Sequence, residues 1–145
     1  MKKYRTLFLI ALIGFIVRVV YLNEFPPALN WDEVSHGFNA YSLLKTGKDE
    51  WGEVLPLIFR AYGDYKLPLY IYSSVIPIAL LGLNSVAVRL PSVLAGVGII
   101  VFTYLIALNI FSRHKILAAV CAFLVALEPW SFFISRAACE ANWAL

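Results

Sequence analysis

Charged residues are scarce in this chain of 145 residues, because Asp, Glu, Lys and Arg together make up only 14% of it. A soluble domain carries about 25% charged residues, so the composition excludes an ordinary soluble protein. Hydrophobic residues make up 61% of the chain, and they gather in runs of the kind that cross a bilayer as helices. We therefore predict an all-α polytopic membrane protein.

The sequence also lacks the patterns of several familiar kinds of site. It contains no glycine-rich phosphate loop, no Ser-His-Asp signature, no basic nucleic-acid patch and no internal repeat. Its two cysteines, Cys121 and Cys139, have neither zinc-ligand spacing nor the spacing of a disulfide framework. We therefore expect no nucleic-acid partner and assign no metal site.

The apolar runs predict three full spans and one partial or re-entrant segment, at about 6–23, 89–111, 116–134 and, for the partial one, 67–81. Basic residues precede the first run and no small-residue cleavage site follows it, so we expect an uncleaved span with a cytoplasmic N-terminus. Arg18 interrupts this first run, and we expect it to snorkel to the outer interface or, alternatively, to contact a lipid phosphate.

The path of segment 67–81 decides which charged residues share a face of the membrane. The segment is shorter than the roughly 20 residues that a span needs. If it does not cross, the basic turn at 112–115 faces the cytoplasm, as positive residues prefer, and Glu140 emerges on the same outer face as Asp32. If it crosses fully, Glu140 lies on the opposite side. We favour the first alternative.

The outer loop at 24–66 holds most of the acidic residues, and its first part predicts an amphipathic helix. Trp31, Val34, Phe38 and Tyr41 recur at helical spacing, with Asn30 before them as a cap and a stop at residues 45–47. Such a helix, with aromatic residues on one face, is expected to lie along a membrane surface.

Two acids open this helix. Asp32 is a candidate general base, whose pKa burial at the interface could tune toward the working pH. Glu33 falls at the third helical position, where a carboxylate closes a capping box, and both acids suit the positive end of the helix dipole. His36 lies one turn after Asp32; the pair could hold a metal, but a polar histidine on the helix face is the favoured interpretation.

Basic residues at headgroup depth are candidates for binding a phosphate. Lys66 is the first of them, with Arg60 and Arg89 as weaker ones, and each could instead snorkel at the interface. Arg136 and Glu140 are four residues apart, which favours a helix-surface ion pair. Glu128 falls inside the last apolar run, where it either reaches the outer interface or faces a cavity with an arginine partner.

Several short motifs follow one another along the chain: Asp32-Glu33 after the first span, then Lys66-Leu67-Pro68-Leu69-Tyr70, Val88-Arg89-Leu90-Pro91-Ser92, Pro129-Trp130, and Ser135-Arg136 with an acid a little later. In this order they resemble the N-terminal part of GT-C type membrane glycosyltransferases, in particular the protein O-mannosyltransferase and aminoarabinose-transferase group. The resemblance covers nearly all of the chain. It implies a GT-C-like transmembrane bundle with an interfacial helix in its first outer loop.

The resemblance also implies an activity and residue roles. Such an enzyme transfers a sugar, with inversion, from a polyprenyl-phosphate donor to a hydroxyl of a glycan, lipid or protein. The transfer takes place on the outer face of the cell membrane. The sequence assigns the enzyme no cofactor, and a divalent metal is possible but not supported. Asp32 would be the catalytic base with Glu33 beside it, Glu140 the second outer-loop acid, and Lys66 a contact of the lipid phosphate. Ser35 stands where some relatives have an arginine, so phosphate binding would fall to Lys66, Arg60 or Arg136. His36 is a further candidate substrate contact.

The resemblance covers only the front end of such enzymes, so we expect a piece of a longer protein that is inactive alone. The alternative is a small non-enzymatic membrane subunit whose acidic outer loop binds a cation or a partner. A binding surface of several charges should tolerate the loss of Asp32, whereas a catalytic base should not.

Overall fold

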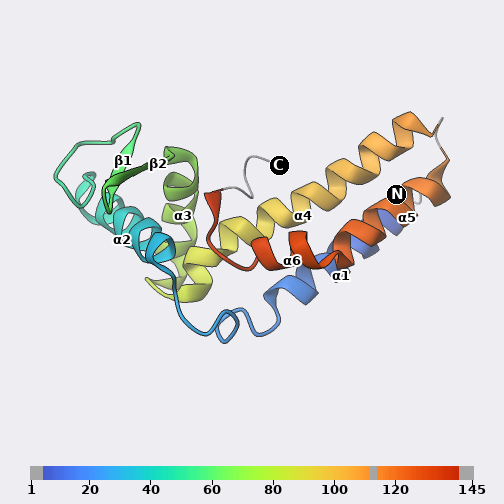
Figure 1. Ribbon diagram of the computed structural model, residues 1–145, viewed down its shortest axis with the longest axis horizontal. Coiled ribbons are helices and arrows are strands. Elements are labelled where there is room, and N and C mark those ends of the chain that lie inside the picture. The colour runs from blue at the N-terminus through green and yellow to red at the C-terminus, as the bar shows by residue number, and fades with distance from the viewer. Residues whose placement is uncertain (1–4, 112–113, 141–145) are drawn as a thin grey trace.

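The computed structural model describes residues 5–111 and 114–140. Within them the chain is mostly helical, as expected, and forms an elongated molecule in which helices gather at two ends (Figure 1). The elements follow in the order α1 (Arg5–Val19), α2 (Trp31–Thr46), β1 (Phe59–Ala61), β2 (Asp64–Lys66), α3 (Pro68–Leu81), α4 (Ser85–Ile110), α5 (Lys115–Leu127) and α6 (Pro129–Ile134).

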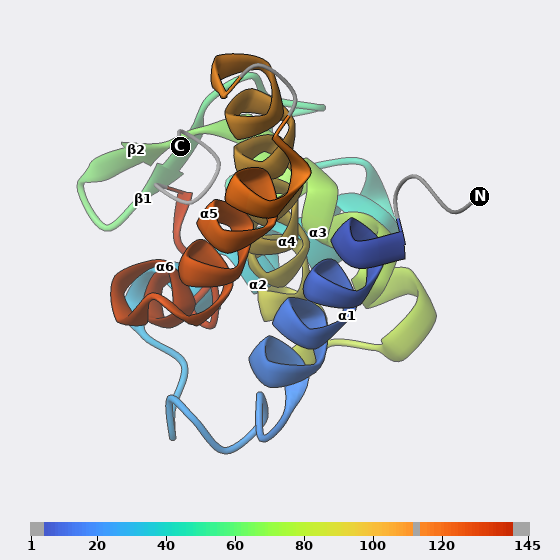
Figure 2. The same cartoon turned by 90° about the vertical axis from the view of Figure 1, so that its right-hand side faces the viewer.

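At one end, α1, α5 and the second half of α4 run alongside one another (Figures 1 and 2). Their shared core is built from small and aliphatic side chains with one tyrosine: Ile10, Ile100, Tyr104, Ala107, Ala118, Ala122 and Ala126. Alanine at spacings of four on α5 keeps one face of that helix flat, so α4 and α5 pack closely along it. This part is called the apolar bundle below.

At the other end, α2, the strand pair, α3 and the start of α4 pack around a second core. Its buried members are Ala40, Leu43, Phe59, Tyr70, Ile71, Ile78, Ala87, Val88 and Ala138. The chain after α6 returns to this end, which is why Ala138 is among them. This part is called the polar head below, because many polar side chains are buried in it.

Among the described residues, α4 is the one helix long and apolar enough to cross a membrane, whereas α3 and α5 are shorter apolar helices. The span expected at 116–134 is not one helix, because the chain breaks at Glu128 into α5 and α6. The residue before a proline is pushed away from helical backbone angles, and Glu128 is extended with φ −61° and ψ 126°. Its carboxylate then caps α6, accepting hydrogen bonds from the amides of Trp130 (2.8 Å) and Ser131 (2.6 Å). The sequence predicts Glu128 at the outer interface or in a cavity with an arginine partner, and neither prediction includes this capping role.

A β-hairpin at residues 59–66 corrects the expectation of an all-α chain. Strands β1 and β2 pair antiparallel, with Ala61 opposite Asp64. The two residues between them, Tyr62 and Gly63, have φ of 50° and 80°. Positive φ at both central positions is the geometry of a type I′ turn, whose twist matches that of paired strands. The Tyr62-Gly63 pair was therefore a turn signal in the sequence, and the strands are too short to show a pattern.

Helix α2 begins and ends where the sequence predicts. Asn30 Oδ1 accepts from the Glu33 amide at 2.8 Å and Glu33 Oε2 accepts from the Asn30 amide at 2.9 Å, which closes the capping box. Gly47 ends the helix in the left-handed conformation. The apolar stripe is exposed, with Trp31 76% accessible, and the buried face is the polar one that carries Glu33 and His36. Contact of the stripe with a membrane surface stays a prediction.

Arg18 does not snorkel. Its side chain is fully buried, and it donates to the carbonyl of Ala126 at 2.9 Å and to the Oγ atoms of Ser135 (2.9 Å) and Ser131 (3.3 Å). It also reaches the Gly14 carbonyl one turn back. Arg18 thus ties the end of α1 to the break between α5 and α6, and both expected roles at the outer interface are wrong.

Candidate active site

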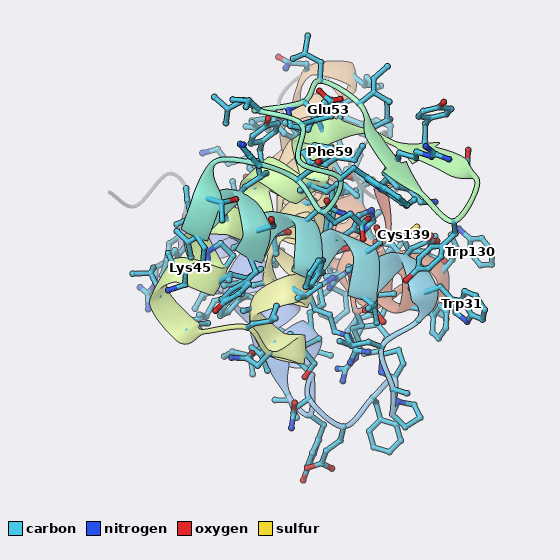
Figure 3. All side chains as sticks on the ribbon, turned by 90° about the vertical axis from the view of Figure 1, so that its left-hand side faces the viewer. Trp31, Lys45, Glu53, Phe59, Trp130 and Cys139 are labelled. Atoms are coloured by element: carbon cyan, nitrogen blue, oxygen red, sulfur yellow. The ribbon has the colours of Figure 1, made fainter. Side chains whose placement is uncertain are left out.

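Four charged or titratable side chains meet in the polar head: Asp32 and His36 from α2, Lys66 from the end of β2, and Glu140 from the segment after α6. Figure 3 looks onto this end of the molecule, with Trp31 and Lys45 at the two ends of α2 and Cys139, next to Glu140 in the chain, near the N-terminal half of that helix. This set is called the charge cluster below. Asp32 and Glu140 therefore lie in the same part of the molecule, and the path of segment 67–81 relative to a membrane stays a prediction.

Asp32 and Lys66 form the accessible half of the cluster. Lys66 Nζ lies 2.9 Å from Asp32 Oδ1 and 3.7 Å from Asp64 Oδ2. The hydrogen bond to Asp32 raises the pKa of Lys66 above its ordinary value, although partial burial acts against it; the charges of Asp32, Glu140 and Asp64 add to the rise. The Asp32 carboxylate is 53% exposed, so one of its faces is open to a substrate.

His36 and Glu140 form the enclosed half. His36 Nε2 lies 3.0 Å from Glu140 Oε1, and the imidazole is 1% exposed against 23% for Glu140. The other carboxylate oxygen, Oε2, accepts the Leu67 amide at 3.2 Å. Glu140 therefore joins α2 to the first residue after Lys66. The ion pair expected between Glu140 and Arg136 is wrong, because Glu140 has these other partners.

Glu33 is fully buried and holds the neighbouring segments together. Arg89 on α4 donates to both of its oxygens, at 2.7 Å from Nε and 3.2 Å from Nη2. Burial disfavours the charged carboxylate, but the hydrogen bonds from Arg89, Asn30 and Ala138 outweigh it, and the pKa of Glu33 lies below its usual range. Glu33 is beside Asp32 in sequence, but its side chain turns into the protein and is 1% exposed.

The peptide of Ala138 is bound from both sides by residues one turn apart on α2. Its amide donates to Glu33 Oε1 at 3.0 Å, and its carbonyl oxygen lies 3.1 Å from His36 Nδ1. Because these side chains lie on one helix face, they dock the segment after α6 along α2. This docking brings Glu140 to His36.

The other basic candidates lie outside the charge cluster. Arg60 is exposed, and its guanidinium stacks over the Trp51 ring at 4.9 Å. Arg89 is 1% exposed and, besides Glu33, donates to the carbonyls of Leu22, Pro26 and Ala28. It is therefore a structural residue and has no free face for a phosphate.

Arg136 is also engaged by backbone. It donates to the carbonyls of Val17, Val20 and Phe25 at 2.8–3.4 Å, and burial lowers its pKa, with the charge of Arg89 acting the same way. It forms part of the wall of an apolar cavity of about 670 Å³ whose other lining residues are Val17, Val20, Tyr21, Phe25, Pro26, Pro27, Phe132 and Phe133. No member of the charge cluster lines that cavity.

The described residues contain no group of three or more His, Cys, Asp or Glu side chains placed to hold a metal ion. Asp32 and His36 turn to different partners, Lys66 and Glu140, and so do not form a two-ligand site. Two acids of the outer loop also have hydrogen-bond partners within the chain. Asp49 Oδ1 accepts from the Trp51 and Glu53 amides, and Glu50 is hydrogen-bonded to the Asn39 side chain.

Three parts of the site were missed from sequence: the role of Arg89, the role of the Ala138 peptide, and the pairing of His36 with Glu140. Arg89 was considered as a phosphate ligand, whereas it neutralises Glu33; a buried acid in a capping box needing a counter-charge was the available signal. The role of the Ala138 peptide had no signal, because any residue offers the same amide and carbonyl.

The family model described as dolichyl-phosphate-mannose-protein mannosyltransferase matches residues 8–140. Comparison with curated proteins and with solved structures found no match. The match includes every residue of the charge cluster and confirms the resemblance drawn from the motifs. The chain belongs to the dolichyl-phosphate-mannose-protein mannosyltransferase family, a family of integral membrane glycosyltransferases.

Proposed function

We propose that this protein transfers a sugar, with inversion, from a polyprenyl-phosphate donor to an acceptor hydroxyl on the outer face of the membrane. The observation that carries the proposal is the contact of 2.9 Å between a half-exposed carboxylate, Asp32, and the ammonium of Lys66. This contact places a proton acceptor next to a cation that can bind a phosphate. The acceptor is a glycan, a lipid or a protein.

The reaction follows from these two groups. The acceptor oxygen attacks the anomeric carbon while Asp32 takes its proton. The bond between that carbon and the phosphate oxygen breaks, and its electron pair leaves with the polyprenyl phosphate. Lys66 stabilises the negative charge that develops there, since a fixed cation near a developing charge lowers the barrier. The proton on Asp32 then passes to water.

Binding of the donor would also release the base. In the free protein Lys66 is bonded to Asp32, and a carboxylate that accepts from an ammonium is occupied at that oxygen. A donor phosphate competes for the same ammonium and draws it from the carboxylate. The base is thus freed when the donor is in place, which disfavours wasteful reaction with water.

The arrangement of the helices supports a multi-pass topology with the site outside. The N-terminal end of α1 and the neighbouring ends of α4 and α5 lie at one end of the molecule, and the polar head lies at the other (Figure 1). Arg5 and Lys115 begin α1 and α5 at the first end. Positive residues favour the cytoplasm, so the charge cluster would face the extracytoplasmic side.

The test is transfer of radiolabelled sugar from a polyprenyl-phosphate donor by membranes that contain the protein. Asp32→Asn should lower kcat by at least about a hundredfold, as removal of a general base does, with binding of polyprenyl phosphate retained. Lys66→Ala should instead weaken that binding. Asp64→Asn is the matched control, because this acid also lies near Lys66 but 3.7 Å away and 75% exposed; it should change neither. Unchanged turnover by Asp32→Asn would overturn the assignment.

A further inference from the structure

The contacts of His36 fix where its protons are. Nδ1 lies 3.1 Å from the carbonyl oxygen of Ala138. A carbonyl oxygen accepts hydrogen bonds and cannot donate them, so Nδ1 carries a hydrogen. In a neutral imidazole the other nitrogen, Nε2, would then present a lone pair.

That second nitrogen faces a carboxylate. Nε2 lies 3.0 Å from Glu140 Oε1, and Glu140 Oε2 accepts the amide of Leu67. Two lone pairs facing each other at this distance repel, so a proton must lie between Nε2 and Oε1. A proton bound to Nε2 makes His36 an imidazolium in a charge-assisted hydrogen bond to the Glu140 carboxylate. A proton bound to Oε1 would leave both groups neutral, and the ¹⁵N measurement below separates the two arrangements.

The surroundings of the ring leave this charge dependent on Glu140. The imidazole is buried against the Tyr70 ring of α3, with centroids 4.8 Å apart. Glu33, one turn earlier on α2, already has Arg89 of α4 as its counter-charge. Asp32, on the same helix, is paired with Lys66 of β2. The docked segment also carries Cys139 and Arg136, and Arg136 turns away to the carbonyls of Val17, Val20 and Phe25.

We propose that His36 is a positioning residue: as an imidazolium it holds Glu140 against the Leu67 amide and thereby fixes the adjacent Lys66 for an anionic phosphate. The proposal rests on the proposed function, because it takes the phosphate of a polyprenyl donor as the ligand of Lys66. His36 itself is 1% exposed and does not touch the donor.

The charge of His36 matters as well as its shape. With both pairs formed, the charge cluster is neutral, because the two carboxylates of Asp32 and Glu140 balance Lys66 and His36. A neutral side chain at position 36 leaves one uncompensated carboxylate beside the phosphate site. Its repulsion acts on the ligand through a partly buried medium, where charges interact more strongly than in water.

The first measurement reads the proton directly and needs no activity. The chain holds two histidines, His36 and His114, so His114→Gln leaves one imidazole for ¹⁵N NMR of the protein in lipid bilayers. Both ring nitrogens of His36 should be protonated at pH 7. A neutral ring overturns the proposal, even where Asp32→Asn has established the transfer reaction.

The second measurement is binding of polyprenyl phosphate to the same preparation. His36→Gln keeps a hydrogen-bond donor without the charge, and its Kd should rise roughly tenfold, which corresponds to about 1.4 kcal/mol. Glu140→Gln added to it restores neutrality and should recover most of the lost affinity. His114→Gln is the matched control and should bind as the parent does.

A merely structural role gives different results. If His36 only fills space, the double variant binds no better than His36→Gln, and this outcome overturns the proposal. If His36→Gln fails to fold, the ¹⁵N measurement alone tests the proposal, because it needs no variant at position 36. If the parent protein shows no sugar transfer but the variants bind polyprenyl phosphate as expected above, the proposed reaction is overturned and the role of His36 stands.

Discussion

The apolar bundle and the polar head are built from helices of similar length but are held together by different forces. The apolar core shared by α1, α4 and α5 is aliphatic or small, with Tyr104 its most polar member, and Arg18 is the buried charge at its edge, bonded to backbone and serine oxygens. The polar head buries Glu33, His36, Asn39 and Arg89 beside its own apolar core. Hydrophobic packing is tolerant of detail, whereas a buried charge has few acceptable partners and so specifies one arrangement. The polar head is thus the end whose arrangement is more narrowly specified, and it carries the candidate site.

The largest expected effect is at the buried ion pair of the polar head. Arg89→Met should destabilise the fold by about 3–5 kcal/mol, because it leaves the Glu33 carboxylate buried without its counter-charge. Thermal unfolding in detergent would measure the loss. The double variant that adds Glu33→Gln should recover part of it, and Ile100→Val in the apolar bundle should cost only about 0.5–1.5 kcal/mol. Equal losses for Arg89→Met and Ile100→Val would remove the distinction between the two ends.

A smaller effect is expected where the two ends join, on α4. A Cβ at Gly96 would lie 2.6 Å from Ser135 Cβ and 3.0 Å from Arg18 Nε, whereas a Cβ at Gly98 meets nothing within 4 Å. Gly96→Ala should therefore cost about 1–3 kcal/mol through overpacking, and Gly98→Ala should be neutral or slightly stabilising through helix propensity. The same unfolding assay compares the pair. A harmless Gly96→Ala would show that the segment after α6 can move away from α4.

Acid should open the polar head before the apolar bundle. The folded-state pKa of Glu33 is lowered, so its stabilising contribution is complete above the ordinary value near 4.5 and is lost as pH falls through the lowered value. Helices α1, α4 and α5 contain no acidic residue. Hydrogen exchange measured as pH falls below about 4.5 should show α2 exposed first. Simultaneous opening of both ends would mean that the fold responds to acid as one unit.

The smallest effect is expected at Arg60. Its exposed stacking on Trp51 is worth about 0.5–1 kcal/mol and lies outside the charge cluster, so Arg60→Ala should leave both donor binding and transfer within about twofold of the parent. Lys66→Ala in the same assay gives the contrast. A large loss of donor binding in Arg60→Ala would bring the hairpin into the phosphate site and enlarge the functional part of the polar head.

The sequence was most informative where a local pattern determines the outcome. The capping box of Asn30 and Glu33 and the stop at Gly47 set the bounds of α2, and hydropathy located the apolar segments. Tyr62-Gly63 and Glu128-Pro129 were also local signals, for a hairpin and for a helix break. The helix break was outweighed by the strong apolar character of the run around it, and the hairpin by the expectation of a helical chain.

The rest depended on partners distant in sequence. Glu33 and Arg89 are 56 residues apart, and Arg18 and Ser135 are 117 apart. No periodicity links such pairs, and a basic residue in an apolar run is equally compatible with snorkelling, ion pairing or binding of backbone carbonyls. The proximity of Asp32, Lys66 and Glu140 was expected from the family resemblance and the topology argument, and His36 as the partner of Glu140 was found only in the structure.

The Ala138 peptide, bound between Glu33 and His36, has a consequence for how the protein is made. Glu33 leaves the ribosome 105 residues before the amide that completes its hydrogen bonds, which at ordinary rates of synthesis is a delay on the order of 5–20 s. During that interval α2 carries an acid and an imidazole that both lack the Ala138 peptide, although Asn30 and then Arg89 are already available to Glu33. The candidate site therefore cannot close before residue 140 has been made, and a ribosome stalled before residue 138 leaves a polar head without its docked segment.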